Sequence, residues 1–100
     1  NMQAMMKKVQ KMQNDMLKAQ EELKKRTVEA TVGGGAVTVV VSGRKELVSI
    51  KINPDAVDLE DIEMLEDMIV SAVNDGIRQA DEMSEKEMAK ITGGMKLPGM

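Results

Sequence analysis

The chain has 100 residues, enough for one domain with a modest core. It contains no Cys and no His, which excludes disulfides, zinc sites of the usual ligand types, cysteine nucleophiles and imidazole acid–base catalysis. The net charge is -3, yet residues 1–26 carry seven basic and three acidic side chains, whereas residues 27–100 carry seven and fourteen. A basic segment on an acidic protein indicates an element that meets a polyanion or an acidic partner surface.

The apolar residues available for a core point to self-association. Phe, Tyr and Trp are absent and Met occurs eleven times, so Val, Ile, Leu, Ala and Met must fill the interior. Met fills irregular gaps but specifies packing weakly, and a small domain built in this way is marginal as a monomer. We therefore expect an obligate homodimer, which a stable folded monomer in sedimentation at low concentration would contradict.

The chain shows no membrane or export signal in its sequence. No segment approaches the ~18 apolar residues that argue for a membrane-spanning helix. The amino end also lacks the apolar run of a signal peptide, because Met5, Met6, Lys7 and Lys8 lead straight into a polar, periodic segment. The lack of Cys agrees with a reducing compartment. We expect a cytoplasmic protein with no membrane partner.

A long helix is predicted over residues 2–23. Apolar residues recur there at spacings of three and four, with good helix formers between them. This heptad seam consists of Met2, Met5, Val9, Met12, Met16, Ala19 and Leu23. Lys24, Lys25 and Arg26 follow where the helix ends, near the negative pole of its macrodipole. The seam is compatible with packing within the chain or with pairing to a helix of another chain, and we favour intrachain packing supplemented by dimer contacts.

Residues 27–52 predict a three-stranded antiparallel meander, because the apolar period changes from helical spacing to alternation. The predicted strands cover 27–32, 36–42 and 47–52. In the middle strand Val37, Val39 and Val41 share one face and Val40 stands on the other, so we expect this strand to be covered on both faces.

Two turns connect these strands, one over residues 33–35 and one over 43–45. The three glycines of the first turn are also compatible with a phosphate-binding loop. However, no Lys followed by Ser or Thr comes next, and a strand follows in place of a helix. We therefore predict a hairpin turn.

A second long helix is predicted from Asp58, the expected N-cap, to about Ile91. Its apolar stripe is wide enough to lie on a sheet and consists of Ile62, Leu65, Ile69, Ala72, Val73, Gly76, Ile77, Ala80 and Met83. Asp75 and Gly76 form a turn signal inside this pattern. Because Gly in a helix costs roughly 1 kcal/mol relative to Ala and permits close backbone approach, we predict an uninterrupted helix. The fold class is therefore α+β.

The lysines of the first helix form a column. Lys11, Lys18 and Lys25 recur every seven residues, about 10.5 Å apart along the axis, with Lys7 one turn before Lys11 and Lys24 beside Lys25. With the seam turned inward, the column faces solvent. Such a row is typical of phosphate contacts with little base discrimination and steep salt dependence. From spacing alone it is more typical of a solvated coiled-coil flank, for example one that pairs with the acidic second helix.

The acidic residues between 55 and 63 do not form a recognisable metal site. They lack the spacing and the central Gly of a calcium loop, and their position at a helix start explains them electrostatically. No cleft with paired carboxylates can be inferred, so an uncharacterised hydrolase is the weakest hypothesis. We predict no enzyme activity, no catalytic residue, no metal site, no cofactor and no small-molecule substrate.

Four segments in order resemble one family. In chain order these segments are KKVQKMQNDMLKAQEEL at 7–23, GGGAVTVVVSGRKELVSIKINPDAVD at 33–58, EDIEMLEDMIVSAVNDGIRQA at 60–80 and MAKITGG at 88–94. This order resembles the YbaB/EbfC family of bacterial nucleoid-associated proteins over nearly the whole chain. The resemblance implies an α+β subunit of two long helices around a three-stranded sheet, forming a tweezer-like homodimer that binds DNA in the nucleoid. We assign residues 1–92 to one YbaB/EbfC-like domain and 93–100 to a flexible C-terminal tail.

The resemblance favours the phosphate-contacting interpretation of the lysine column. We expect a homodimer that contacts phosphates of double-stranded DNA with low sequence specificity, affecting nucleoid organisation and gene expression. The expected affinity is weak or moderate, and dimerisation raises it by bringing two basic arms to one duplex. The expected DNA-binding residues are Lys7, Lys8, Lys11, Lys18, Lys24, Lys25 and Arg26, with Lys96 in the tail as a weaker candidate. The alternative is a protein-interaction adaptor whose basic N-terminal helix docks an acidic partner or a partner helix.

Overall fold

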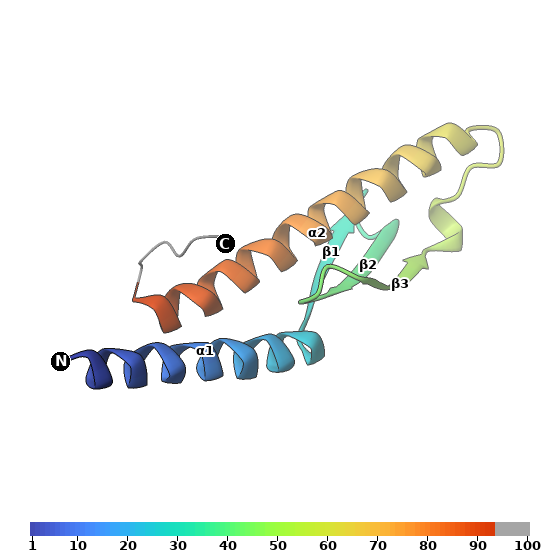
Figure 1. Ribbon diagram of the computed structural model, residues 1–100. Coiled ribbons are helices and arrows are strands. Elements are labelled where there is room, and N and C mark those ends of the chain that lie inside the picture. Colours follow the sequence, from blue (N-terminus) through green and yellow to red (C-terminus); the bar gives the residue numbers. More distant parts are fainter. Residues whose placement is uncertain (94–100) are drawn as a thin grey trace.

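The computed structural model describes residues 1–93, which form two long helices and one sheet (Figure 1). The elements are α1 (Met2–Lys25), β1 (Thr27–Val32), β2 (Val37–Ser42), β3 (Leu47–Ile52), the short 3-10 helix η1 (Pro54–Ala56) and α2 (Ile62–Thr92). The predicted α+β class is therefore confirmed. Residues 94–100, which hold most of the predicted tail and Lys96, lie outside the described residues.

Helix α1 follows its predicted bounds closely. The side-chain Oδ1 of Asn1 accepts a hydrogen bond from the Ala4 N–H at 2.8 Å and so caps the first turn. At the other end Arg26 turns to an extended conformation, and the chain enters β1 at the next residue. Only one residue therefore connects the helix to the sheet.

The sheet is an antiparallel meander in the order β1-β2-β3, as predicted. Three glycines with positive φ form the β1–β2 turn, which agrees with the predicted hairpin. On β2, Val37, Val39 and Val41 are fully buried against α2 and form the centre of the core. These valines share one face because successive side chains of a strand alternate.

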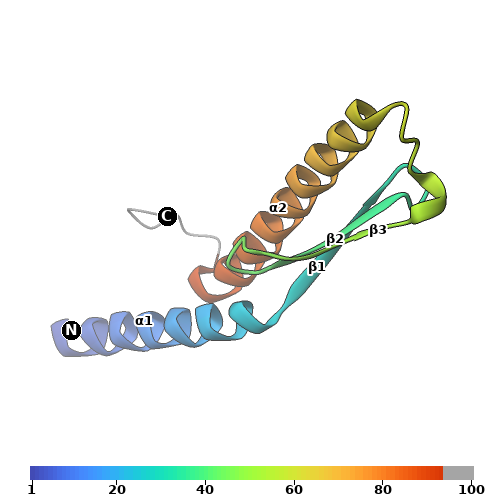
Figure 2. The same ribbon diagram turned by 90° about the vertical axis from the view of Figure 1, so that its right-hand side faces the viewer.

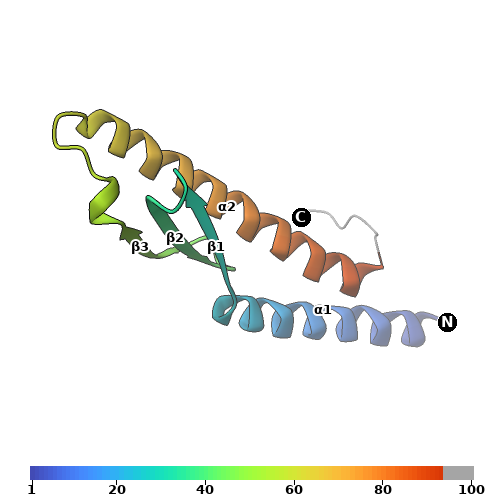
Figure 3. The same cartoon turned by 180° about the vertical axis from the view of Figure 1, so that it is seen from behind.

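Only one face of the sheet is covered within the subunit. Helix α2 packs against β1 and β2 on this face, and Figures 2 and 3 show the opposite face without a covering helix. Val40, on the opposite face, is half-buried, and every residue of β3 is exposed. The expectation that the middle strand is covered on both faces is therefore wrong for a single subunit, because α1 leaves the sheet instead of lying across it.

Helix α2 begins one turn later than predicted. Asp61, and not Asp58, is the N-cap, since its Oδ1 accepts from the Met64 N–H at 3.2 Å. The Asp58 side chain accepts instead from the Glu60 N–H at 2.9 Å and stabilises a preceding turn. Gly93, in the left-handed conformation, ends the helix.

Gly76 lies inside an uninterrupted α2, as predicted. A Cβ at this position would lie 2.7 Å from Cγ2 of Val41 and 3.2 Å from Cγ2 of Val39. The absence of a side chain thus lets the helix backbone approach the middle strand closely, which explains why a helix-weakening residue stands at this position.

A second, smaller core joins the two helices. Ala19 and Leu23 of α1 pack with Met88 of α2, supported by half-buried neighbours on both helices. The first half of the seam has no such partner in the described chain, and Met2, Met5 and Val9 are exposed. Intrachain packing of the seam is therefore confirmed for its second half only, and the start of α1 projects as an arm from a molecule of 70 × 20 × 17 Å. Neither α1 nor α2 combines the length and the apolar character that crossing a bilayer requires.

Candidate nucleic-acid interface

The lysine column of α1 points away from the rest of the subunit. Leu23 and Ala19 fix the inward side of the helix, because both are buried against α2. At 3.6 residues per turn, the column residues lie about 120° to 160° around the axis from Leu23. The column consists of Lys7, Lys11, Lys18 and Lys25, and all four are exposed.

The ammonium groups of this column have no carboxylate partner in residues 1–93. None of the ion pairs within residues 1–93 includes Lys7, Lys8, Lys11, Lys18 or Lys25. The alternative in which the column pairs with the acidic second helix of its own chain is therefore not realised. Five of the seven predicted DNA-binding residues present positive charge to solvent.

Lys24 is held on its own helix. Its Nζ lies 2.7 Å from Oε1 of Glu21, and this hydrogen bond lowers the pKa of the Glu21 carboxyl. Both side chains are exposed, so water screens the pair and its net contribution to stability is small. The Lys24 ammonium can therefore leave Glu21 for another anion at little cost.

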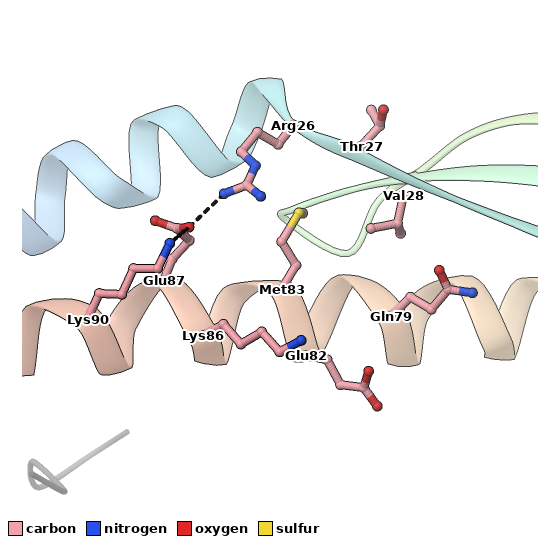
Figure 4. A pocket seen from close by; sticks show the side chains of 9 residues that line it. All are labelled: Arg26, Thr27, Val28, Gln79, Glu82, Met83, Lys86, Glu87 and Lys90. Atoms are coloured by element: carbon pink, nitrogen blue, oxygen red, sulfur yellow. Dashed lines mark hydrogen bonds and ion pairs between the residues drawn. The ribbon is translucent and has the colours of Figure 1, made fainter. Parts of the chain in front are cut away.

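Arg26 occupies a different environment from the lysines. Its guanidinium lies 2.9 Å from Oε1 of Glu87 on α2, and Lys90 reaches the same oxygen at 3.1 Å (Figure 4). The hydrogen bonds from Arg26 and Lys90 lower the pKa of the Glu87 carboxyl, which stays ionised at neutral pH. Any stabilisation by this pair is present above the usual pKa of Glu and is lost as the pH falls through the lowered value. Arg26 thus fastens the end of α1 to α2.

A hollow of about 460 Å³ lies beside this ion pair, between the start of β1 and α2. Figure 4 shows that its side chains carry both signs of charge and include the apolar Val28 and Met83. Over residues 1–93, no group of three or more Asp, Glu, His or Cys side chains is placed to hold a metal ion. The mixed charge does not favour an anionic ligand in this hollow.

The β2–β3 turn brings two further cations, Arg44 and Lys45, to the end of α1. Their sequence pattern indicated only a turn. Lys45 has a positive φ of 65°, and its Nζ lies 2.7 Å from Oδ1 of Asp81 on α2. Arg44 lines a second hollow together with Lys24. The sequence contains the two basic residues, but their position beside α1 depends on the folding of the sheet against the helix.

The subunit as a whole defines a class of small α+β proteins in which a basic leading helix projects from a sheet packed on one long helix. The crystal structure of an uncharacterized protein from Helicobacter pylori has this fold, with a TM-score of 0.74 and 28% identity over 85% of this chain and 89% of that chain.

Two curated relatives, each called "Nucleoid-associated protein", extend the comparison to sequence. The relative from Pelotomaculum thermopropionicum is 59% identical and the one from Desulforamulus reducens is 60% identical, both over 100% of this chain and 95% of the relative. The model of the YbaB/EbfC DNA-binding family matches residues 1–95. The chain belongs to this family.

Proposed function

We propose that the protein is a homodimeric component of the bacterial nucleoid that binds double-stranded DNA through the phosphates it meets along α1. This proposal rests mainly on the column of exposed lysines, which lies on the side of α1 opposite its buried seam. Within residues 1–93 these lysines form no ion pair with a carboxylate. Membership of a DNA-binding family and the names of the relatives support DNA as the polyanion.

The chemistry of the column supports low sequence specificity. Lysine provides a point charge on a flexible stem, whereas reading a base edge usually needs a side chain with two fixed hydrogen bonds. Contacts between ammonium groups and phosphates position a protein on a duplex without distinguishing bases. We infer that the protein organises DNA broadly and affects gene expression through this organisation.

The inner face of β3 supports the homodimer. Ile50 pairs in register with Val39, and Ile52 with Val37, so these isoleucines lie on the same side of the sheet as the buried valines. They are nevertheless 41% and 36% exposed, because α2 covers β1 and β2 but not β3. An apolar strip is therefore left open beside the core.

One flank of α2 continues this strip. Asp81 of α2 forms an ion pair with Lys45 of the β2–β3 turn. Asp81 therefore lies on the flank of α2 that faces β3. Ile77 lies one turn before Asp81 on this flank, and Val70 lies two turns before Ile77. Ile77 is 37% exposed and Val70 is 59% exposed. A second copy that offers the same surface would cover both strips in a self-complementary contact, and the dimer would carry two basic arms.

We expect Ile50→Asp to raise the dimer dissociation constant by more than about tenfold, because it places a carboxylate without a partner in an apolar contact. Leu17→Asp is the matched control, since Leu17 is 61% exposed on α1 and lies away from this surface. Sedimentation equilibrium of both variants gives the measurement. An Ile50→Asp variant that dimerises like the parent protein would exclude β3 from the interface.

The proposal as a whole is tested by titrating the protein against several unrelated duplexes at two salt concentrations. We expect affinities that agree within about threefold between sequences, and a log–log salt dependence with a slope of about −0.9 for each phosphate contacted. Absence of binding at the lower salt concentration would reject the DNA-binding proposal. A strong preference for one duplex would reject low specificity.

The exposed first half of the α1 seam favours a second candidate function. Met2, Met5 and Val9 form an apolar stripe without a partner in the described chain, and such a stripe suits a partner helix. Under this alternative the protein is an adaptor that docks an acidic partner or a partner helix. The same titration separates the two functions, because the adaptor has no reason to bind duplexes with a steep salt dependence.

A further inference from the structure

We propose that the hollow between the last turn of α1 and the β2–β3 turn binds one phosphodiester group of DNA, as a contact separate from the lysine column. This inference rests on the proposed DNA-binding function. The hollow measures about 340 Å³ and brings together two cations, a hydroxyl and an amide. Its lining residues are Gln20, Leu23, Lys24, Gly43, Arg44 and Ser84.

The backbone around this hollow is fixed. The N–H of Gly43 donates to the Arg26 carbonyl at 2.9 Å, which ties the turn to the end of α1. A Cβ on Gly43 would lie 2.2 Å from the Leu23 carbonyl oxygen, so only glycine permits this close approach. The Oγ of Ser42 also accepts from the N–H groups of Arg44 and Glu46 at 3.3 Å each. Arg44 is therefore presented from an ordered turn.

The two cations of the turn have different roles. Lys45 is paired with Asp81 at 2.7 Å, and this hydrogen bond raises the pKa of the Lys45 ammonium. Arg44 has only a loose pair with Glu46 at 3.7 Å, and both side chains are more than half exposed. A surface pair of this length contributes little, so the Arg44 guanidinium is available to a phosphate, which it can bind through two N–H groups.

Lys24 and Arg44 line the same hollow from two different elements. The carboxyl of Glu21 has a lowered pKa because Lys24 donates a hydrogen bond to it, and the charges of Lys25 and Arg44 add to this effect. One exposed carboxylate thus lies near three cations in the free protein, and two of them, Lys24 and Arg44, line the hollow. A phosphodiester group in the hollow would meet the same two cations.

A phosphate contact at this hollow would restrict the orientation of α1 on a DNA duplex. If only a single row of lysines contacts the DNA, α1 can rotate about its own axis without losing its contacts with the phosphates. Lys24 lies about 100° around the helix from Lys25, and Arg44 comes from a different element, so the additional contact opposes this rotation. The turn would therefore fix the orientation of α1 on DNA.

The test uses Lys24→Gln, Arg44→Gln and the double variant, with Arg78→Gln as the matched control. Arg78 is exposed on α2, pairs with Asp75 and does not line the hollow. Duplex affinity is measured by fluorescence anisotropy over a series of salt concentrations, with the dimer and its thermal unfolding checked for each variant. We expect each single variant at the hollow to bind about three- to tenfold more weakly, with the salt slope reduced by about one for each subunit that contacts the duplex.

The double variant carries the sharper test. If both cations hold one phosphate, the double variant loses less affinity than the product of the two single losses. Losses that multiply would overturn the shared site. An Arg44→Gln variant that binds DNA as tightly as Arg78→Gln would also overturn the shared site. The proposed DNA-binding function would still stand if Glu substitutions in the lysine column abolish binding. Persistent binding after those Glu substitutions would reject the proposed function itself.

Discussion

Replacement of Lys11, Lys18 and Lys25 by Glu is expected to weaken duplex binding by about 100-fold or more at low salt. Each subunit loses three phosphate contacts and gains three repulsive charges. The proposed dimer should persist, because the three side chains are exposed and lie opposite the seam that packs on α2. Anisotropy titration reports the affinity, and sedimentation of the same sample reports the oligomeric state.

A control of equal charge separates the column from the net charge of the protein. Lys51, Arg78 and Lys86 are exposed on β3 and α2, so their replacement by Glu changes the charge by the same amount without touching α1. We expect this control to lose much less affinity than the column variant. Equal losses would show that the charge of the whole protein matters and that the column has no special role. Unchanged binding by a column variant that is still dimeric would contradict the proposed function.

Gly76→Leu is expected to destabilise the subunit by about 3 kcal/mol or more, or to prevent folding. The first added carbon would already lie 2.7 Å from Cγ2 of Val41, and both Val41 and Val39 are fully buried. The gain in helix propensity, roughly 1 kcal/mol, does not offset this overlap. The two layers would have to separate, which would open the main core.

Urea unfolding at a fixed protein concentration measures this effect, because the stability of the proposed dimer would depend on concentration. Ala89→Leu serves as the control, since Ala89 is exposed near the end of the same helix. We expect this control to stay within about 0.5 kcal/mol of the parent protein. A Gly76→Leu protein with the parent's midpoint would show that α2 does not approach the sheet so closely.

The periodicity of the sequence predicted the elements well, because helical and strand patterns are local properties. The bounds of α1, β1 and β3 agree with the predicted ranges to within two residues. The start of α2 was less predictable. Asp58 and Asp61 both suit an N-cap, and the choice between them depends on which N–H groups each carboxylate meets in the folded loop.

The candidate site was predictable only in part. The exposure of Lys11, Lys18 and Lys25 follows from the heptad, so the sequence alone indicated a solvent-facing column. The pairing of Arg26 with Glu87 joins residues 61 positions apart, and periodicity contains no information on such a contact. The same holds for Arg44, whose position beside Lys24 requires the sheet and the helix to be in place.

The length of α1 also bears on what the protein can distinguish in DNA. A helix of 24 residues is about 36 Å long, which matches the ~34–36 Å of one full turn of B-form duplex. A DNA fragment shorter than one turn cannot contact the full length of α1 when the helix lies along the duplex. The extent of uninterrupted duplex, more than the order of its bases, would then set the strength of the complex.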